Sequence, residues 1–213
     1  MTPPRTPAEL TKRAIAGFFD ELCAAHKTVT VFDGAGHALD FADGLALAVE
    51  ILVTETSRGR KIMFVGNGAS AAISSHQAVD YWKTGGMRAV AFNDAALLTC
   101  ISNDFGYAQV FERPIEMFAD AGDVLVAVSS SGRSENIVRA ARIARAKGCR
   151  VITMSGFDRE NALRRLGDLN FYVASKSYGH VEVTHLSLSH CLLDTIVAIH
   201  GSPPREEPPG VEG

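Results

Sequence analysis

Val124-Leu125-Val126-Ala127-Val128-Ser129-Ser130-Ser131-Gly132-Arg133-Ser134 is an apolar run of strand length that ends in four serines around a glycine. A helix-like segment, 135–147, follows at once. A strand that delivers hydroxyls and free backbone N–H groups to a helix N-terminus forms a site for an anion such as phosphate. We therefore predict that this serine-rich loop binds an anion, with phosphate as the expected one.

A second loop of the same kind lies earlier, where Ile62–Val65 leads into Gly66-Asn67-Gly68-Ala69-Ser70 and a helix-like segment. This pattern fits the loose dinucleotide fingerprint, with Asp94 as the acid that would bind a ribose. The separation of Gly66 from Asp94 is longer than the usual ~20 residues, and a dinucleotide does not explain the serine-rich loop. A compact phosphorylated ligand explains both loops, with Ser70 offering its hydroxyl and backbone N–H.

From residue 61 onward the chain alternates between predicted strands and predicted helices. The predicted strands are 61–65, 88–92, 123–129, 150–154 and 170–173. The predicted helices are 70–83, 95–102, 107–118, 134–147, 159–166 and 181–200. Continuous apolar strands separated by helices indicate a parallel sheet covered on both faces. The expected fold is a three-layer, doubly wound α/β domain over 61–200.

Two further helices are expected in residues 1–60. Thr6-Pro7-Ala8-Glu9 has the cap, proline and glutamate of a helix start, and 39–57 is predicted as the second helix. A short extended piece fits 27–32. Both helices are rather apolar for a free surface, so we expect them to form an oligomer contact. The tail, 201–213, is rich in Pro, Glu and Gly and is expected to be disordered.

Composition excludes several classes of protein. The 213 residues carry a formal net charge of −3 and no basic block, so a nucleic-acid partner is not expected. No apolar run reaches the roughly 18 residues of a membrane span, and the first residues lack a signal-peptide core. The four cysteines form no CxxC pair, which favours reduced thiols in a cytoplasmic protein.

The two loops together resemble the sugar isomerase (SIS) domain family, which binds phosphosugars. Three further stretches, 101–107, 121–125 and 182–185, make the chain similar to the phosphoheptose isomerases within that family. This resemblance implies a five-stranded parallel sheet and a homotetramer with active sites near subunit boundaries. It also implies phosphate contacts from Ser70 and the serines of the second loop, with Asn67 and Asp94 contacting or bordering the sugar.

The resemblance implies the interconversion of sedoheptulose 7-phosphate and a heptose 7-phosphate through an enediol. Such a reaction needs a base for the carbon-bound proton and a group that shuttles protons on the oxygens, and a divalent metal would stabilise the developing charge. The family positions correspond to His76, Asp80, Glu182 and His190. We expect Asp80 and His190 to transfer protons, and all four side chains to hold Zn²⁺ or another divalent ion.

Several residues depart from the family pattern, and all lie near the sugar. Asp80 is shorter than the family's Glu, and Glu182 replaces a Gln. Lys83 is the only cation near the position of a family Arg, and Gly179 replaces an Asp, with His180 beside it. Glu182 and His190 are also separated by roughly 12 Å along one straight helix, so they meet at one ion only if their side chains converge.

The sequence leaves one alternative from another class, a non-catalytic SIS protein that binds a phosphosugar as a regulator or assembly factor. His76, Asp80 and His190 together argue against it, because a binding module does not need an acid–base set. The two phosphate loops do not distinguish between these functions, because an isomerase and a non-catalytic phosphosugar-binding protein would both need them.

Overall fold

The computed structural model describes residues 6–202, and its centre is a parallel sheet. The parallel strands are β3 (Ile62–Val65), β4 (Ala89–Ala91), β5 (Val124–Ser129), β6 (Arg150–Gly156) and β7 (Leu169–Val173). They lie in the order β7-β6-β5-β3-β4, so the chain reverses direction across the sheet between β3 and β5. The five predicted parallel strands are confirmed.

Two short strands extend this sheet beyond β7. β1 (Thr30–Asp33) pairs antiparallel with β7, with Phe32 opposite Asn170, and β2 (Ala38–Leu39) pairs antiparallel with β1. The full sheet therefore has seven strands, two more than expected. The extended piece predicted over 27–32 forms β1, displaced by a few residues toward the C-terminus.

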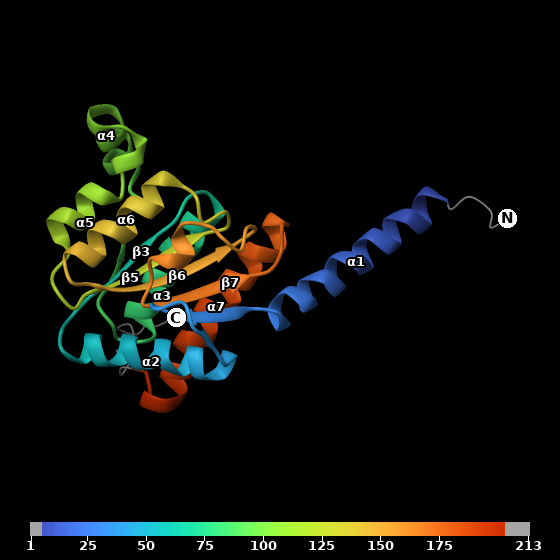
Figure 1. The fold of residues 1–213 in the computed structure, drawn as a ribbon, viewed down its shortest axis with the longest axis horizontal. Helices are drawn as coiled ribbons and strands as arrows, with labels where there is room; N and C mark the ends of the chain where they lie inside the picture. The colour runs from blue at the N-terminus through green and yellow to red at the C-terminus, as the bar shows by residue number, and fades with distance from the viewer. Residues whose placement is uncertain (1–5, 203–213) are drawn as a thin grey trace, which may run out of the picture.

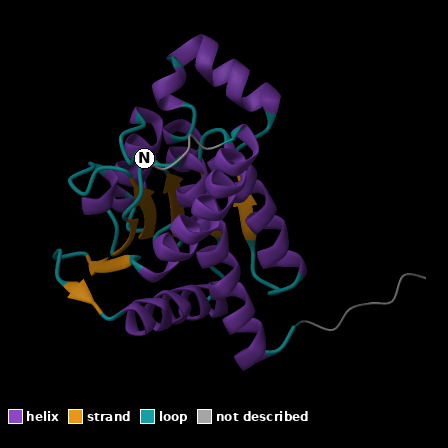
Figure 2. Ribbon diagram, turned by 90° about the vertical axis from the view of Figure 1, so that its right-hand side faces the viewer, coloured by secondary structure: helices purple, strands orange, loops and turns teal. Residues whose placement is uncertain are grey.

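The described part of the chain contains seven α-helices. They are α1 (Pro7–Lys27), α2 (Phe41–Ser57), α3 (Ala69–Lys83), α4 (Ala95–Phe105), α5 (Glu112–Phe118), α6 (Glu135–Ala146) and α7 (Tyr178–His200). Two 3₁₀ helices, η1 (Tyr107–Gln109) and η2 (Leu163–Arg165), complete the set. Figures 1 and 2 show the strands enclosed between helices on both sides.

Two predicted helices were wrong in extent. Residues 159–166 form only η2, because Asn161 closes a local turn: its side chain donates to the Asp158 carbonyl at 2.8 Å and accepts from the Arg164 N–H at 3.0 Å. The predicted helix 107–118 is split between η1 and α5. Pro114 lacks an N–H and fits only the first turn of a helix, so α5 begins shortly before it.

Successive side chains of each strand point to opposite faces of the sheet, so the domain has two hydrophobic cores, one on each face. Ile62 and Phe64 of β3 face the core covered by α2 and α7, whereas Met63 and Val65 face the core covered by α5 and α6. All four side chains are at most 1% exposed. This arrangement confirms the predicted three layers, and it places α3 and α7 in contact beside β3.

Helix α1 extends away from the sheet (Figure 1). It begins as predicted, with a capping box in which Thr6 and Glu9 exchange side-chain to backbone hydrogen bonds. None of the helices between residues 6 and 202 is long and apolar enough to cross a membrane. The predicted tail lies outside the described residues from 203 onward.

Candidate functional site

The two glycine- and serine-containing loops meet at the carboxyl ends of β3 and β5, which are neighbours in the sheet. This is the edge of an open α/β sheet where ligands bind. The loops enclose a cleft of about 240 Å³, here called the serine cleft. It is lined by Asn67, Gly68, Ala69, Ser70, Ser129, Ser130, Ser131, Ser134, Tyr178 and Glu182.

Two helix N-termini are directed at this cleft. Helix α3 begins after Gly68, whose φ of +55° suits glycine, and α6 begins after Ser134; neither N-cap makes a side-chain capping bond. Gly66 lets the chain pass close to α3, because a Cβ there would lie 2.4 Å from the Ser70 carbonyl oxygen. The uncapped backbone N–H groups and the helix dipoles therefore favour an anion in the cleft.

Three consecutive serines of the second loop differ in their bonding. The Ser129 and Ser131 hydroxyls accept from the N–H groups of Gly132 and Arg133, at 3.2 and 3.3 Å. The Ser130 hydroxyl is buried and has no hydrogen-bond partner among the described residues. A buried hydroxyl without a partner is costly, so Ser130 Oγ is a donor that a bound anion would satisfy.

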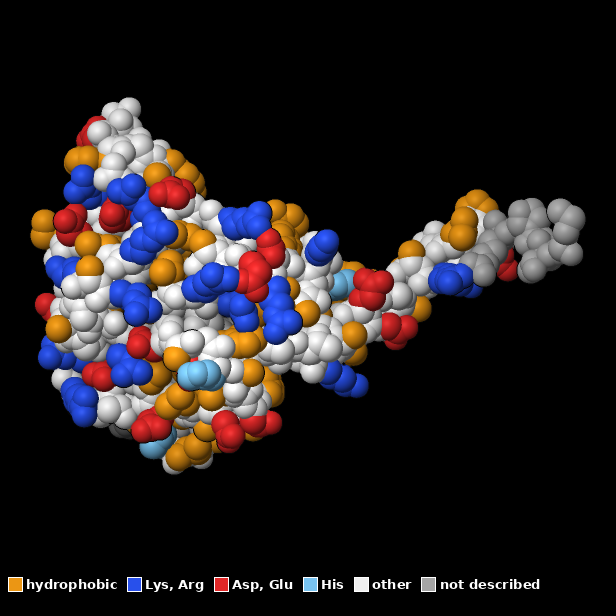
Figure 3. Space-filling model, in the orientation of Figure 1, with side chains coloured by type: hydrophobic (Ala, Val, Ile, Leu, Met, Phe, Trp, Pro, Cys, Tyr) orange, Lys and Arg blue, Asp and Glu red, His pale blue; other side chains and the backbone are white. Residues whose placement is uncertain are grey.

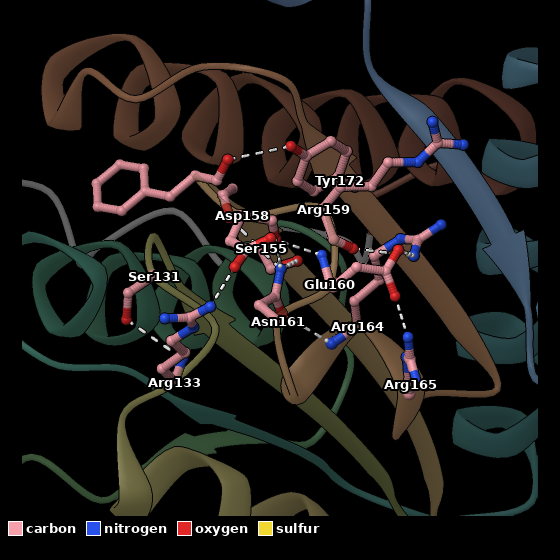
Figure 4. A network of polar contacts seen from close by, with 12 residues as sticks. Ser131, Arg133, Ser155, Asp158, Arg159, Glu160, Asn161, Arg164, Arg165 and Tyr172 are labelled. Carbon is pink, nitrogen blue, oxygen red and sulfur yellow. Dashed lines mark hydrogen bonds and ion pairs between the residues drawn. The ribbon is translucent and has the colours of Figure 1, made fainter.

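The outer side of the serine loop is fixed by a polar network (Figure 4). Arg133 pairs with Asp158, and the fully buried Asn161 donates to Ser155 Oγ at 3.1 Å. Gly132 packs directly on Asn161. The Gly132 N–H donates to the Ser129 carbonyl at 3.1 Å and to Ser129 Oγ at 3.2 Å. The loop is thus held in one conformation before any ligand arrives.

A second group of functional side chains lies on α3 and α7. His76 Nε2 lies 3.1 Å from Asp80 Oδ2, as expected for residues one helical turn apart. The His190 ring lies 5.4 Å from the His76 ring, centroid to centroid. One ligand atom from each of the three side chains lies within 4.8 Å of the others, so we call this set the His–Asp cluster.

Glu182 lies in the serine cleft and is not part of the His–Asp cluster. The eight-residue separation from His190 on α7 accounts for this, because the helix carries the two side chains about 12 Å apart along its axis. Burial raises the pKa of the Glu182 carboxyl above its ordinary value. Its predicted role as a fourth metal ligand stays a prediction.

Replacing Glu182 by glutamine is expected to strengthen phosphate binding in a pH-dependent way. Above its raised pKa the carboxylate is charged and repels an anion in the same cleft; below it, the neutral acid resembles glutamine. The Kd ratio of wild type to Glu182→Gln should therefore rise from near one at low pH to about three- to tenfold at pH 8. Titration with inorganic phosphate checks this, and a ratio independent of pH would contradict it.

The other predicted residues occupy varied positions. Asn67 lines the cleft, whereas Asp94 is exposed and caps α4 by accepting from the Leu97 N–H at 2.9 Å. Lys83 is exposed and does not line the cleft. His180 is buried against Phe18 of α1, with ring centroids 4.7 Å apart.

Sequence reasoning missed Tyr178, Tyr107 and Asn136. Tyr178 lines the serine cleft from the start of α7, and the other two contact Asn67. Of the three, Asn136 could have been found from the sequence. It lies two residues after Ser134 in the first turn of a predicted helix, where asparagine is unusual because its side chain competes for the backbone hydrogen bonds. Tyr107 ends the stretch 101–107 on which the resemblance rests, whereas Tyr178 carried no local signal.

Comparison with known proteins agrees with this geometry. A family model described as "SIS domain" matches residues 23–156. The phosphoheptose isomerase of Geobacter sulfurreducens is 35% identical over 163 residues, which cover 74% of this chain and 86% of that protein. Two solved phosphoheptose isomerase structures share the fold with a TM-score of 0.76. The Neisseria gonorrhoeae protein is 28% identical in sequence, and the match covers 88% of this chain and 99% of that one. The Francisella tularensis protein is 25% identical, and the match covers 91% of this chain and 100% of that one.

Proposed function

This chain belongs to the SIS domain family and, within it, to the phosphoheptose isomerases, and we propose that it interconverts sedoheptulose 7-phosphate and a heptose 7-phosphate. The observation that carries the proposal is the pairing of two sites. The serine cleft offers hydroxyls and two helix N-termini to a phosphate, and the His–Asp cluster lies on α3 and α7, the helices that begin at the cleft. A phosphosugar isomerase needs both sites.

The phosphate half of the substrate fits the serine cleft. Ser70, Ser129, Ser131 and Ser134 present hydroxyls, and Ser130 adds a buried hydroxyl without a partner. Hydrogen bonds to a charged phosphate oxygen are worth more than bonds between neutral groups, which suits a ligand that must be held by one end. Asn67 and Glu182 border the same cleft, and we propose that they contact the sugar.

Replacing Ser130 by alanine is expected to weaken inorganic phosphate binding by about tenfold with little change in thermal stability. The hydroxyl makes no bond within the described protein, so folding loses nothing when it is removed. Ser74→Ala is a matched control, because Ser74 Oγ is also buried without a partner but lies outside the cleft. Equal loss of affinity in both variants would contradict the assignment.

The His–Asp cluster supplies the groups that aldose–ketose isomerisation requires. Asp80 is proposed to take the carbon-bound proton, and His190 to move protons on the two oxygens of the enediol. His76 lies 3.1 Å from Asp80 and orients its carboxylate.

Two imidazoles and a carboxylate are also a donor set that suits Zn²⁺. Donor atoms around one zinc lie about 3–4 Å apart for bonds of ~2.0–2.2 Å, so a spacing within 4.8 Å needs only small side-chain adjustments. We propose that His76, Asp80 and His190 would hold such an ion. When bound, it would stabilise negative charge on the substrate oxygens.

The variant His76→Ala is expected to lose most of its bound zinc, because one of three donors is removed. Elemental analysis after dialysis against Zn²⁺ measures the metal content per chain. His37→Ala is the matched control, since His37 also lies 3.0 Å from an aspartate four residues away but has no third donor within the cluster distance among residues 6–202. Unchanged zinc in His76→Ala would contradict the ligand assignment.

One assay separates the isomerase from a phosphosugar-binding regulator. The pure protein is incubated with sedoheptulose 7-phosphate in the presence of Zn²⁺, and the aldose product is measured. We expect turnover with sedoheptulose 7-phosphate and none with unphosphorylated sedoheptulose. Tight phosphosugar binding without turnover on any six- to eight-carbon sugar phosphate would instead support the regulator.

We also propose that the protein works as a cytoplasmic homotetramer. Helix α1 leaves Leu10, Ile15, Phe18 and Phe19 between 41% and 60% exposed. Figure 3 shows apolar side chains along this projecting helix. Such a face is typical of a protein–protein contact. The four cysteines are unpaired, which suits a reducing compartment. Sedimentation velocity tests the oligomer, and a monomer at micromolar concentration would contradict it.

A further inference from the structure

Three side chains from distant parts of the chain form a polar bridge beside the serine cleft. Asn67 belongs to the first loop, Asn136 to the first turn of α6 after the serine loop, and Tyr107 to η1. Asn67 and Asn136 exchange two side-chain hydrogen bonds, both 2.9 Å long. The Tyr107 hydroxyl donates to Asn67 Oδ1, also at 2.9 Å. We call these three residues the amide bridge.

The bridge fixes which way each amide faces. The Ile137 N–H can only donate, and it lies 3.0 Å from Asn136 Oδ1, so this atom must be the oxygen. The nitrogen of Asn136 then faces Asn67, and the atom of Asn67 that it contacts must be the carbonyl oxygen. A backbone group in α6 thereby sets the orientation of a side chain in the other loop.

The same contacts leave one group of Asn67 available. Its Oδ1 accepts from both Asn136 and Tyr107, which uses both lone pairs. Its Nδ2 carries two hydrogens, and one of them goes to Asn136 Oδ1. The second has no partner within residues 6–202, and Asn67 lines the serine cleft while Asn136 does not.

We propose that Asn136 and Tyr107 are positioning residues, which hold the Asn67 amide so that its remaining N–H donates to a substrate oxygen. The proposal rests on the proposed function for the nature of the ligand, a sugar phosphate. Asn136 is 3% exposed and cannot touch the ligand itself, so it acts through Asn67. The bridge also ties the two phosphate loops together across the carboxyl edge of the sheet.

The test uses the variants Asn136→Leu and Tyr107→Phe, each in the wild-type background and in an Asn67→Ala background. Leucine keeps the shape of asparagine, and the Ile137 N–H still donates to the Ser134 carbonyl at 3.0 Å, so α6 keeps its first turn. Tyr107 is 56% exposed, and loss of its hydroxyl leaves its ring in place. Tyr107→Phe therefore decides the question if Asn136→Leu does not fold.

The probe is glucitol 6-phosphate, a polyol phosphate that has no carbonyl and cannot be isomerised. Calorimetry should show its binding weakened by about tenfold in each variant, and by less than twofold when Asn67 is already alanine. With sedoheptulose 7-phosphate, KM should rise while kcat changes little. Thr153→Val is the control: it removes a buried 2.7 Å bond to Asn170 and should lower stability without changing binding.

Two results would overturn the proposal. One is unchanged binding of glucitol 6-phosphate in both variants. The other is an equal loss of binding with and without Asn67, which would mean that the bridge only supports the fold. Both results are binding measurements and do not require turnover. A wild-type protein that binds glucitol 6-phosphate but does not isomerise sedoheptulose 7-phosphate would contradict the proposed function. The role of the amide bridge would still be tested by the binding of glucitol 6-phosphate.

Discussion

Replacing His190 by alanine, or Asp80 by asparagine, is expected to lower kcat by about 10²- to 10⁴-fold with KM nearly unchanged. This is the usual contribution of a positioned acid or base to catalysis. Both side chains lie in the His–Asp cluster, away from the groups that line the serine cleft. Steady-state kinetics with sedoheptulose 7-phosphate measure the effect.

The chain contains a matched control for this experiment. His37 and Asp33 form a second histidine–aspartate pair, 3.0 Å apart and four residues apart, with Asp33 at the end of β1 and His37 just before β2. His37→Ala and Asp33→Asn should leave kcat within about twofold of wild type. A kcat within about threefold of wild type in His190→Ala or Asp80→Asn would remove these two residues from the proton-transfer step.

Replacing Gly132 by alanine is expected to destabilise the protein by roughly 3 kcal/mol and to weaken phosphate binding at least tenfold. The residue has a φ of +60°, and a Cβ would lie 1.9 Å from Asn161 Oδ1. Strain at positive φ costs about 1–2 kcal/mol, and overpacking adds about 1–3 kcal/mol. For a chain of this size the loss lowers Tm by roughly 10 °C.

The variant Gly36→Ala separates the cost of backbone strain at positive φ from the cost of the steric clash. Gly36 has a φ of +88° and nothing within 4 Å of a Cβ, so it has the strain without the clash. It should lose about 1 kcal/mol and keep phosphate affinity. Asn161 cannot move aside freely, because it is fully buried and its amide is bound on both sides. Equal stability losses in the two variants would show that the serine loop tolerates a side chain at Gly132.

The fold was largely predictable because its signals are local and repeated. Apolar runs such as Val124–Ser129 are too short for helices, and they do not alternate with polar residues as half-exposed strands do. They therefore predict strands buried on both faces of a parallel sheet. β1 and β2 were harder, because β2 has only two residues and its pairing depends on the edge that β7 presents. The helix expected over 159–166 was wrong because Asn161 uses its side chain to close a turn.

The candidate site was predictable in parts. Glycines and serines after buried strands predict an anion site, since the carboxyl ends of parallel strands meet at one edge. His76 and Asp80 were paired by helical spacing, and the structure places them 3.1 Å apart. The contact of His190 with them depends on how α7 packs on α3, which only the resemblance supplied. The amide bridge joins residues 40 and 69 positions apart, and no local pattern predicts such contacts.

Isomerisation in D₂O tests the central claim most directly, that side chains of this chain carry a proton between adjacent carbons through an enediol. Sedoheptulose 7-phosphate is incubated with the zinc-loaded protein in D₂O, and the sugars are examined by NMR. We expect aldose product with deuterium at C2, formed at least about 10²-fold more slowly with Asp80→Asn. Aldose that still lacks deuterium after the two sugars have reached equilibrium through many turnovers would indicate a hydride shift in place of the enediol. No product and no label from wild-type protein that still binds the sugar phosphate would contradict the isomerase itself.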